Sequence, residues 1–194
     1  MANIQKHKLK ELLEICKDVD GDTMEIGVLY GDTFKMLAPF SADMGKKAFA
    51  LDSFCGMDEA GEFDGSRYPK GRLSVGGVDR FKKILSSHSV KENTYECFEG
   101  YIPVCFEKFD EEYPDKKLSF VLLDVDHYEP TVKALAWFWE KIPSGGILVL
   151  DDYFKNKGLL ASKAIDEWLP QKKDEMEVLE LNNTQLFIKK IINI

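Results

Sequence analysis

Short apolar runs alternate with longer amphipathic segments along most of the chain. The run at 118–124 is apolar throughout, which is typical of a central parallel strand covered on both faces. Segment 5–17 instead places Leu9, Leu12 and Cys16 at helical spacing. The same pattern predicts strands at 24–28, 47–52, 94–98, 118–124, 147–150, 176–181 and 185–190. It predicts helices at 5–17, 31–38, 78–85, 130–142 and 159–169.

The order of these elements predicts one doubly wound α/β domain spanning residues 1–194. Strands that alternate with helices form a mainly parallel, Rossmann-like sheet, here of seven strands. The last two strands flank Asn182 and Asn183, which indicates a closing antiparallel hairpin. Segment 1–20 carries an N-terminal helix, and no repeat or linker divides the chain. Segment 53–77 is long, glycine-rich and without periodicity, so we expect a lid loop there.

Composition and charge narrow the function classes. The 194 residues carry a formal net charge of -8, which disfavours general nucleic-acid binding because phosphate backbones attract Lys and Arg. No apolar run approaches the roughly 20 residues that span a bilayer, and the charged N-terminus does not resemble a signal peptide. The scattered cysteines suit reduced thiols in the cytoplasm. We therefore expect a cytoplasmic protein with a small-molecule substrate and neither a membrane nor a nucleic-acid partner; the sequence leaves a homodimer open.

Glycines and acids gather where the first two predicted strands end. Glu25, Gly27, Gly31 and Thr33 lie along the first strand and its following turn, and Asp52 ends the second strand. Open α/β sheets bind ligands beyond the carboxyl ends of their strands, where an acid can accept hydrogen bonds from ribose hydroxyls. The spacing Glu-x-Gly-x-x-x-Gly differs from the G-x-G-x-x-G of pyrophosphate binders, which favours S-adenosylmethionine. The alternative is that the glycines only form a tight turn and Asp52 only caps a helix.

A second group of acids follows the strands predicted at 118–124 and 147–150. Asp124 ends the first of these strands, and Asp151 and Asp152 follow the second. Because adjacent parallel strands lie about 4.8 Å apart, these carboxylates are predicted to converge. Converging carboxylates repel one another unless a cation is present, and oxygen ligands suit Mg²⁺, Ca²⁺ or Mn²⁺. The alternative is that the acids, Asp152 in particular, cap the following helices.

Other polar residues give weaker signals. His127 is a candidate general base because imidazole titrates near neutral pH, and it is equally well explained as a loop histidine beside Tyr128. A run of basic residues in and after the 53–77 loop could bind an anionic substrate group or could form a solvated face. It consists of Arg67, Lys70, Arg72 and Arg80.

Four stretches of the chain, the last of them a pair, carry a family resemblance. They are EIGVLYGDT (25–33), LDSFCGM (51–57), FEGYIP (98–103), and LLDVDHYEPT (122–131) paired with GGILVLDDY (145–153). The last pair is the most specific, since Asp-x-Asp-x-Tyr-Glu-x-Thr followed by Asp-Asp-Tyr at this separation is hard to find by chance. Over residues 24–189 the chain resembles the macrocin O-methyltransferase-like family, which are class I methyltransferases that act on sugars.

The resemblance implies a class I methyltransferase fold with an S-adenosylmethionine pocket and a Mg²⁺ site. The implied pocket residues are Glu25, Gly27, Gly31, Asp52 and Ser53, with Glu99 and Gly100 near the adenine. The implied metal ligands are Asp124, Asp151 and Asp152, with Asp124 beside the cofactor and a candidate base. The chain departs from the family at Asp32, where a small residue is usual, and lacks the longer N-terminal extension that helps to shape the substrate pocket and the dimer.

We therefore predict a Mg²⁺-assisted O-methyltransferase that methylates a hydroxyl of a sugar, polyol or other small molecule. A non-catalytic module that binds S-adenosylmethionine on the same fold is the alternative. A nicotinamide-dependent oxidoreductase is disfavoured because the chain lacks a G-x-G-x-x-G turn after its first strand.

Overall fold

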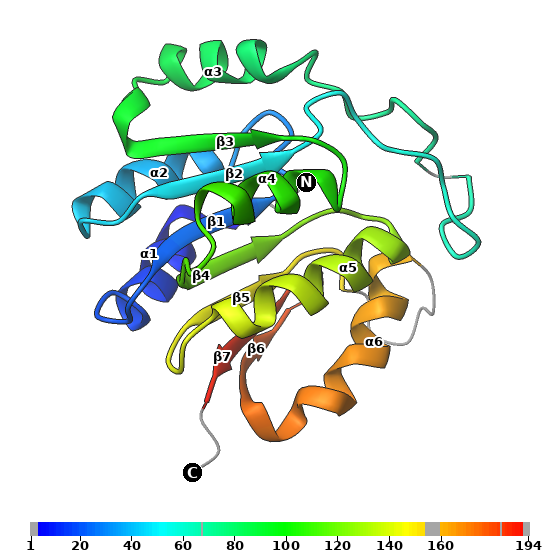
Figure 1. Ribbon diagram of the computed structural model, residues 1–194. Coiled ribbons are helices and arrows are strands. Elements are labelled where there is room, and N and C mark those ends of the chain that lie inside the picture. The colour runs from blue at the N-terminus through cyan, green and yellow to red at the C-terminus, as the bar shows by residue number, and fades with distance from the viewer. Residues whose placement is uncertain (1–3, 67, 154–159, 183, 192–194) are drawn as a thin grey trace.

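The computed structural model describes residues 4–66, 68–153, 160–182 and 184–191, which form one seven-stranded sheet flanked by helices (Figure 1). The strands lie in the order β3-β2-β1-β4-β5-β7-β6. They are β1 (Asp22–Ile26), β2 (Ala48–Asp52), β3 (Tyr95–Glu99), β4 (Leu118–Leu123), β5 (Ile147–Leu150), β6 (Met176–Leu181) and β7 (Leu186–Lys190). Strands β1 to β5 pair in parallel, and β7 is antiparallel to both β5 and β6. The predicted doubly wound sheet with a closing hairpin is confirmed.

The sheet changes its direction of winding between β1 and β4. From β1 the chain first adds β2 and β3 on one side, and then crosses over to add β4 and β5 on the other. Such a crossover leaves a crevice beyond the carboxyl ends of the strands, where open α/β sheets bind their ligands. Ile26, the last residue of β1, is paired with Leu51 on one side and Leu123 on the other. The tips of these three strands therefore meet at one edge.

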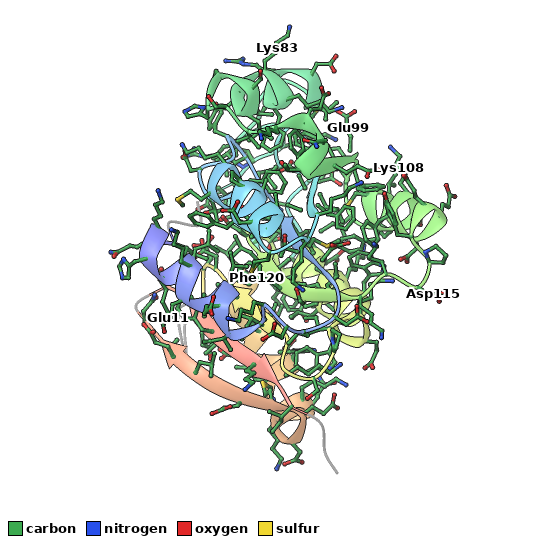
Figure 2. The ribbon with its side chains drawn as sticks, turned by 90° about the vertical axis from the view of Figure 1, so that its left-hand side faces the viewer. Glu11, Lys83, Glu99, Lys108, Asp115 and Phe120 are labelled. Carbon is green, nitrogen blue, oxygen red and sulfur yellow. The ribbon has the colours of Figure 1, made fainter. Side chains whose placement is uncertain are left out.

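Helices cover both faces of the sheet. One face carries α1 (Lys6–Ile15), α2 (Phe34–Asp43) and α3 (Val78–Ser87), and the other carries α4 (Val104–Glu112), α5 (Tyr128–Phe138) and α6 (Leu160–Lys172). Phe81 of α3 and Phe109 of α4 belong to the two separate apolar clusters that result. Phe120 of β4 is fully buried and lies between the helix bearing Glu11 and the helix bearing Lys108 (Figure 2). None of the described helices has the length and apolar character needed to cross a bilayer.

Helix α4 is an element that the sequence pattern does not predict. It connects β3 to β4, and it buries Cys105, Phe106 and Phe109 against the sheet. Only nine residues long, it carries several charged residues between these apolar positions, which weakens the helical pattern. The apolar spacing of Cys105, Phe109 and the half-buried Tyr113 is nevertheless helical.

Other helix boundaries differ from the predicted ones by a few residues. The helix predicted at 31–38 begins at Phe34 and continues through Pro39 to Asp43, since burial of its apolar face outweighs the backbone hydrogen bond that a proline cannot make. Helix α5 begins at Tyr128, so Pro130 lies in its first turn, where no N–H is needed. A 3₁₀ turn at Trp139–Lys141 follows it; similar turns occupy Glu92–Thr94 and Lys173–Glu175. Arg67 and Asn183 lie outside the described residues, and so does residue 159, the start of the helix predicted at 159–169.

The loop at 53–77 lies beyond β2, at the edge where the parallel strands end (Figure 1). Its two branches are joined near the sheet, because the N–H of Met57 donates to the carbonyl of Arg72 and the N–H of Gly71 donates to the carbonyl of Met57, both at 2.8 Å. Phe54 is 1% exposed, and its ring packs against that of Phe81. The described part of the loop is thus attached to the body of the protein.

Candidate active site

A cavity opens beyond the carboxyl ends of β1, β2 and β4. Its wall comes from the tips of these strands, from the loop after β2, from the turn after β3 and from the start of α5. Six residues of the predicted site or its neighbourhood line it, namely Gly27, Asp52, Ser53, Gly100, Asp124 and His127. Apolar side chains, including Ile26, Leu51 and Ile102, complete much of the wall. The cavity therefore combines an apolar surface with acids at its edge.

Gly27 follows the first strand in a conformation that other residues rarely adopt. Its φ is +84°, in the region that favours glycine. The N–H of Gly27 donates to the carbonyl of Leu51, and the N–H of Asp124 donates to the carbonyl of Ile26. The chain thus turns away from the sheet at a point where β2 and β4 are both still hydrogen-bonded to it.

Asp52 holds the turn after β1. Its Oδ2 accepts hydrogen bonds from the N–H groups of Val28 at 2.8 Å and Leu29 at 3.1 Å, and its Oδ1 accepts from the N–H of Phe54 at 2.7 Å. Its half-buried side chain also lines the cavity. The Ser53 hydroxyl also donates to Oδ1 at 3.4 Å. Four donors thus share the roughly four lone-pair sites of the carboxylate, and a ligand hydroxyl would replace the longest of these bonds. The alternative role for Asp52 is a helix cap. Its carboxylate does not cap a helix, because the N–H groups that donate to it belong to loops.

Glu25 is a buried acid in the middle of the sheet. It is 2% exposed, and its Oε2 has no hydrogen-bond partner among the described residues. Burial raises the pKa of Glu25 well above its usual value, and the nearby charges of Asp124 and Asp52 raise it further. An unpaired buried carboxyl is unfavourable, so this position suits a ligand that brings a hydrogen-bond donor or a positive charge.

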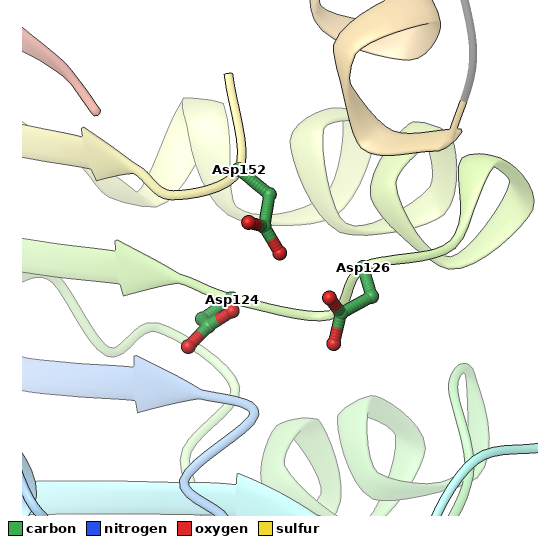
Figure 3. A group of neighbouring side chains, drawn as sticks. All are labelled: Asp124, Asp126 and Asp152. Atoms are coloured by element: carbon green, nitrogen blue, oxygen red, sulfur yellow. The ribbon is translucent and has the colours of Figure 1, made fainter. Parts of the chain in front are cut away.

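Three acids from the tips of β4 and β5 converge. Asp124, Asp126 and Asp152 each place one carboxylate oxygen within 4.8 Å of the others, and Figure 3 shows the three side chains as neighbours beyond the strand tips. Asp126 and Asp152 both have positive φ, +59° and +53°, which is uncommon for residues other than glycine and clusters at functional sites. Asp126 was not among the predicted ligands, although it follows Asp124 by only two residues.

The electrostatics of this acid cluster fit a cation. Burial raises the pKa of Asp126 to about 9, helped by a hydrogen bond with Asp152 and by the charge of Asp124. Without a positive charge, then, the cluster retains a proton at neutral pH. Carboxylate oxygens are the ligands that Mg²⁺, Ca²⁺ and Mn²⁺ prefer, and a cation between them would remove the repulsion that holds the proton.

Asp151 lies beside this cluster but is directed elsewhere. Its Oδ1 accepts a hydrogen bond of 2.8 Å from Nε2 of Gln185, at the start of β7. Burial raises the pKa of Asp151 to about 6, while the Gln185 bond acts in the opposite direction. Within the described residues, the group of converging acids contains Asp152 and not Asp151. The expected metal ligands are Asp124, Asp151 and Asp152. The structure brings Asp124 and Asp152 together, whereas Asp151 is hydrogen-bonded to Gln185.

His127 ends the loop before α5, but it is buried, with 1% of its surface exposed, and it lines the cavity. Its Nδ1 lies 3.9 Å from Oδ2 of Asp64, a buried acid of the 53–77 loop. Its Nε2 is buried and has no hydrogen-bond partner in the described part of the chain. No sequence signal marks Asp64, since it contacts its partners across more than sixty positions of the chain.

Several predicted residues do not line the cavity, and Glu25, Asp151 and Asp152 are among them. Gly31 packs under α3, where an added Cβ would meet the ring of Phe81 at 3.0 Å, and Thr33 is buried directly before α2. Glu99 is exposed at the end of β3, while the adjacent Gly100 is in the wall. Lys70 of the basic run pairs with Glu59 at 3.1 Å within its own loop, which agrees with a solvated face.

Comparison with known proteins identifies the same fold and a family. Residues 2–190 match the family model described as macrocin-O-methyltransferase (TylF). A methyltransferase of Streptomyces olivaceus, 8-demethyl-8-(2,3-dimethoxy-alpha-L-rhamnosyl)-tetracenomycin-C 4'-O-methyltransferase, is 26% identical over 151 residues, which cover 70% of this chain and 54% of that protein. The chain therefore spans about half the length of this relative.

Two solved structures share the class I methyltransferase fold of this chain. The calicheamicin methyltransferase CalS11 has a TM-score of 0.76 at 21% identity, covering 95% of this chain and 80% of its own. The O-methyltransferase NovP has a TM-score of 0.75 at 17% identity, covering 96% and 79%. These structures support the fold, and the family model, which matches nearly the whole chain, decides the family. The chain belongs to the macrocin O-methyltransferase family.

Proposed function

We propose that the chain is an S-adenosylmethionine-dependent O-methyltransferase that methylates a hydroxyl of a sugar or related polyol with the help of Mg²⁺. One observation carries the proposal: Gly27 and Asp52, at the crossover of the sheet, line the same cavity as Asp124 and Asp126 of the acid cluster. Membership of the family supports methyl transfer. The name of the Streptomyces olivaceus relative, which methylates a rhamnosyl group, supports a sugar acceptor.

The proposed cofactor site extends from the crossover of the sheet to the turn after β3. The turn at Gly27 leaves space for the methionine part, whose ammonium group would pair with Glu25, an acid buried behind the cavity wall whose Oε2 has no partner among the described residues. Asp52 would accept a hydrogen bond from the ribose in place of its long bond from Ser53, and Ser53 and Gly100 line the adjoining wall. Gly31, Thr33 and Glu99 stay predictions, with Gly31 and Thr33 acting through the packing of the turn. Bound S-adenosylmethionine would supply a methyl group on a positively charged sulfur.

The proposed metal site uses Asp124 and Asp152, which both the geometry and the family resemblance favour. In the structure Asp126 completes the converging group. The resemblance instead implies Asp151 as the third ligand, although its side chain is bound to Gln185. Single substitutions of Asp126 and of Asp151 decide which of the two is the third metal ligand. A bound Mg²⁺ would lower the pKa of a substrate hydroxyl and orient its oxygen.

The residues of the site would then act by orientation and charge. The acid cluster would fix the acceptor oxygen in line with the methyl carbon, so that the new oxygen–carbon bond forms as the carbon–sulfur bond breaks. The hydroxyl proton would pass to a side chain in the cavity wall, for which Asp124 and His127 are the candidates. The products are a methyl ether and S-adenosylhomocysteine. A homodimer and a cytoplasmic location stay predictions.

Titration calorimetry with S-adenosylmethionine, with and without Mg²⁺, tests this function against the non-catalytic alternative. An enzyme of this kind binds the cofactor and binds Mg²⁺ through the acid cluster. A protein that binds S-adenosylmethionine but neither Mg²⁺ nor any hydroxyl compound would favour the non-catalytic module, and a protein that binds none of them would end the proposal.

A further inference from the structure

The loop between β2 and α3 reaches the beginning of α5 through one buried side chain, Asp64. Asp64 is 4% exposed. Its Oδ1 accepts the N–H of Tyr128 at 2.7 Å, and its Oδ2 accepts the N–H of Gly61 at 2.8 Å. Tyr128 is the first residue of α5, and its N–H is one of those that a helix cannot satisfy internally. The residue before it, His127, makes no side-chain capping bond, so Asp64 supplies the cap from a distant loop.

Further contacts fix this part of the loop. The ring of Phe63 lies against that of Tyr128, with centroids 4.8 Å apart. The carbonyl of Phe63 accepts a hydrogen bond from the N–H of Leu160, the first residue of α6, at 3.2 Å. Segment 61–64 is therefore attached to both α5 and α6, and the position of Asp64 is determined by several independent contacts.

The same carboxyl faces the ring of His127. Oδ2 of Asp64 lies 3.9 Å from Nδ1 of His127, and both side chains are 1% exposed. The other ring nitrogen, Nε2, is buried and has no hydrogen-bond partner in the described part of the chain. His127 also lines the cavity beside Asp124 and Asp126, so a bound molecule that reaches Nε2 would supply the missing partner.

We propose that Asp64 is a positioning residue that holds the ring of His127, so that Nε2 accepts a hydrogen bond from a hydroxyl group of the methyl acceptor. The proposal rests on the proposed function and adds an acceptor contact to it. At 3.9 Å the carboxylate is beyond direct hydrogen-bond distance from Nδ1, but its negative charge in this buried place favours the tautomer with hydrogen on Nδ1, and this leaves a lone pair on Nε2. The ligand class is then a compound with an O–H donor near the reacting hydroxyl, as in a sugar with neighbouring hydroxyls.

Nitrogen-15 NMR of the histidine rings tests the position of the proton directly. The chain contains 3 histidines, so the spectrum is simple, and His127→Gln assigns the signals of interest. We expect the full-length protein at neutral pH to show His127 with hydrogen on Nδ1. In Asp64→Asn, the amide oxygen can accept from Tyr128 or from Gly61 but not from both. The orientation that keeps the Tyr128 cap gives up the Gly61 bond and places NH₂ near Nδ1, so hydrogen should move to Nε2. Hydrogen on Nε2 in the wild type, or an unchanged tautomer in Asp64→Asn, would overturn the proposal.

Glu62→Gln is the matched control. Glu62 lies two residues from Asp64 in the same loop, carries the same type of charge and is exposed, so its substitution should leave the His127 signals unchanged. Slow exchange of the Tyr128 amide in Asp64→Asn shows that the cap and the fold are retained. A change of tautomer in Glu62→Gln would mean that general loop charge, and not Asp64, sets the state of the ring.

Titration of the protein, loaded with S-adenosylhomocysteine, with methyl α-L-rhamnopyranoside tests the acceptor contact. The Nε2 resonance of the wild type should shift on binding, and Asp64→Asn and His127→Gln should each weaken binding of the rhamnoside about tenfold, while calorimetry finds the affinity for S-adenosylmethionine unchanged. An Nε2 resonance that stays fixed at saturating rhamnoside would contradict the proposed hydrogen bond. A wild-type protein that does not bind S-adenosylmethionine would instead contradict the proposed function. The tautomer measurement needs no cofactor, so failure of the Asp64 proposal and failure of the proposed function can be told apart.

Discussion

A β-carbon at position 27 would lie 1.9 Å from the backbone oxygen of Asp124. Gly27 therefore serves two purposes, since its missing side chain allows β1 and β4 to approach and its positive φ turns the chain out of the sheet. The residue that shapes the proposed cofactor side of the cavity thus lies directly against the residue that begins the acid cluster.

Gly27→Ala should accordingly destabilise the protein severely, by about 3 kcal/mol or more, because both the backbone conformation and the contact are lost. Gly45→Ala is the matched control, because Gly45 also has a positive φ of +72° but nothing lies within 4 Å of an added Cβ. That control should cost only about 1–2 kcal/mol. Urea unfolding of the two variants measures the difference, and equal costs would show that the close approach to Asp124 is unimportant.

Glu25→Gln should weaken binding of S-adenosylmethionine about tenfold, or about 1.4 kcal/mol, because the neutral amide cannot pair with the cofactor's ammonium group. Calorimetry at neutral pH measures the affinity. Glu99→Gln, at an exposed acid outside the cavity wall, is the control and should bind normally. Unchanged affinity in Glu25→Gln would place the ammonium elsewhere.

The acids of the cluster predict how the stability of the metal-free protein depends on pH. The pKa of Asp126 rises from 3.8 to about 9 on folding, so between these values the folded state holds a proton that the unfolded state has released. The contribution of Asp126 to the free energy of unfolding therefore falls as the pH rises through this range. Thermal unfolding from pH 5 to pH 9 should show a smaller decline in Asp126→Asn than in the wild type. A steeper decline in the variant would reverse the predicted sign.

Asp124→Asn and Asp152→Asn should each weaken Mg²⁺ binding by at least about tenfold, since each removes a charged oxygen ligand. The rise in melting temperature on adding Mg²⁺ provides the readout, independently of turnover. Glu129→Gln is the control, because Glu129 is exposed in the first turn of α5 and outside the converging group. Normal Mg²⁺ stabilisation of both cluster variants would exclude this metal site.

The sequence predicts the sheet well, because apolar runs such as that of β4 reflect burial on both faces. It also places acids and glycines at the correct strand ends. It does not indicate which of two adjacent acids, Asp151 or Asp152, faces the cluster, because neighbouring side chains point in different directions and the local turn decides between them. The role of Asp64 is hidden for another reason, since its partners on α5 are brought to it only by the folded loop.

The most direct test of the central claim is transfer of an isotope-labelled methyl group. The protein would be incubated with S-adenosylmethionine labelled in its methyl group and with methyl α-L-rhamnopyranoside, with Mg²⁺ or with a chelator, and the products analysed by mass spectrometry. We predict a labelled methyl ether and S-adenosylhomocysteine in equal amounts with Mg²⁺ and a strongly reduced yield in the chelator. Equal yields under both conditions would contradict the assisting metal, and label transferred to no hydroxyl compound while the cofactor binds normally would contradict O-methyl transfer itself.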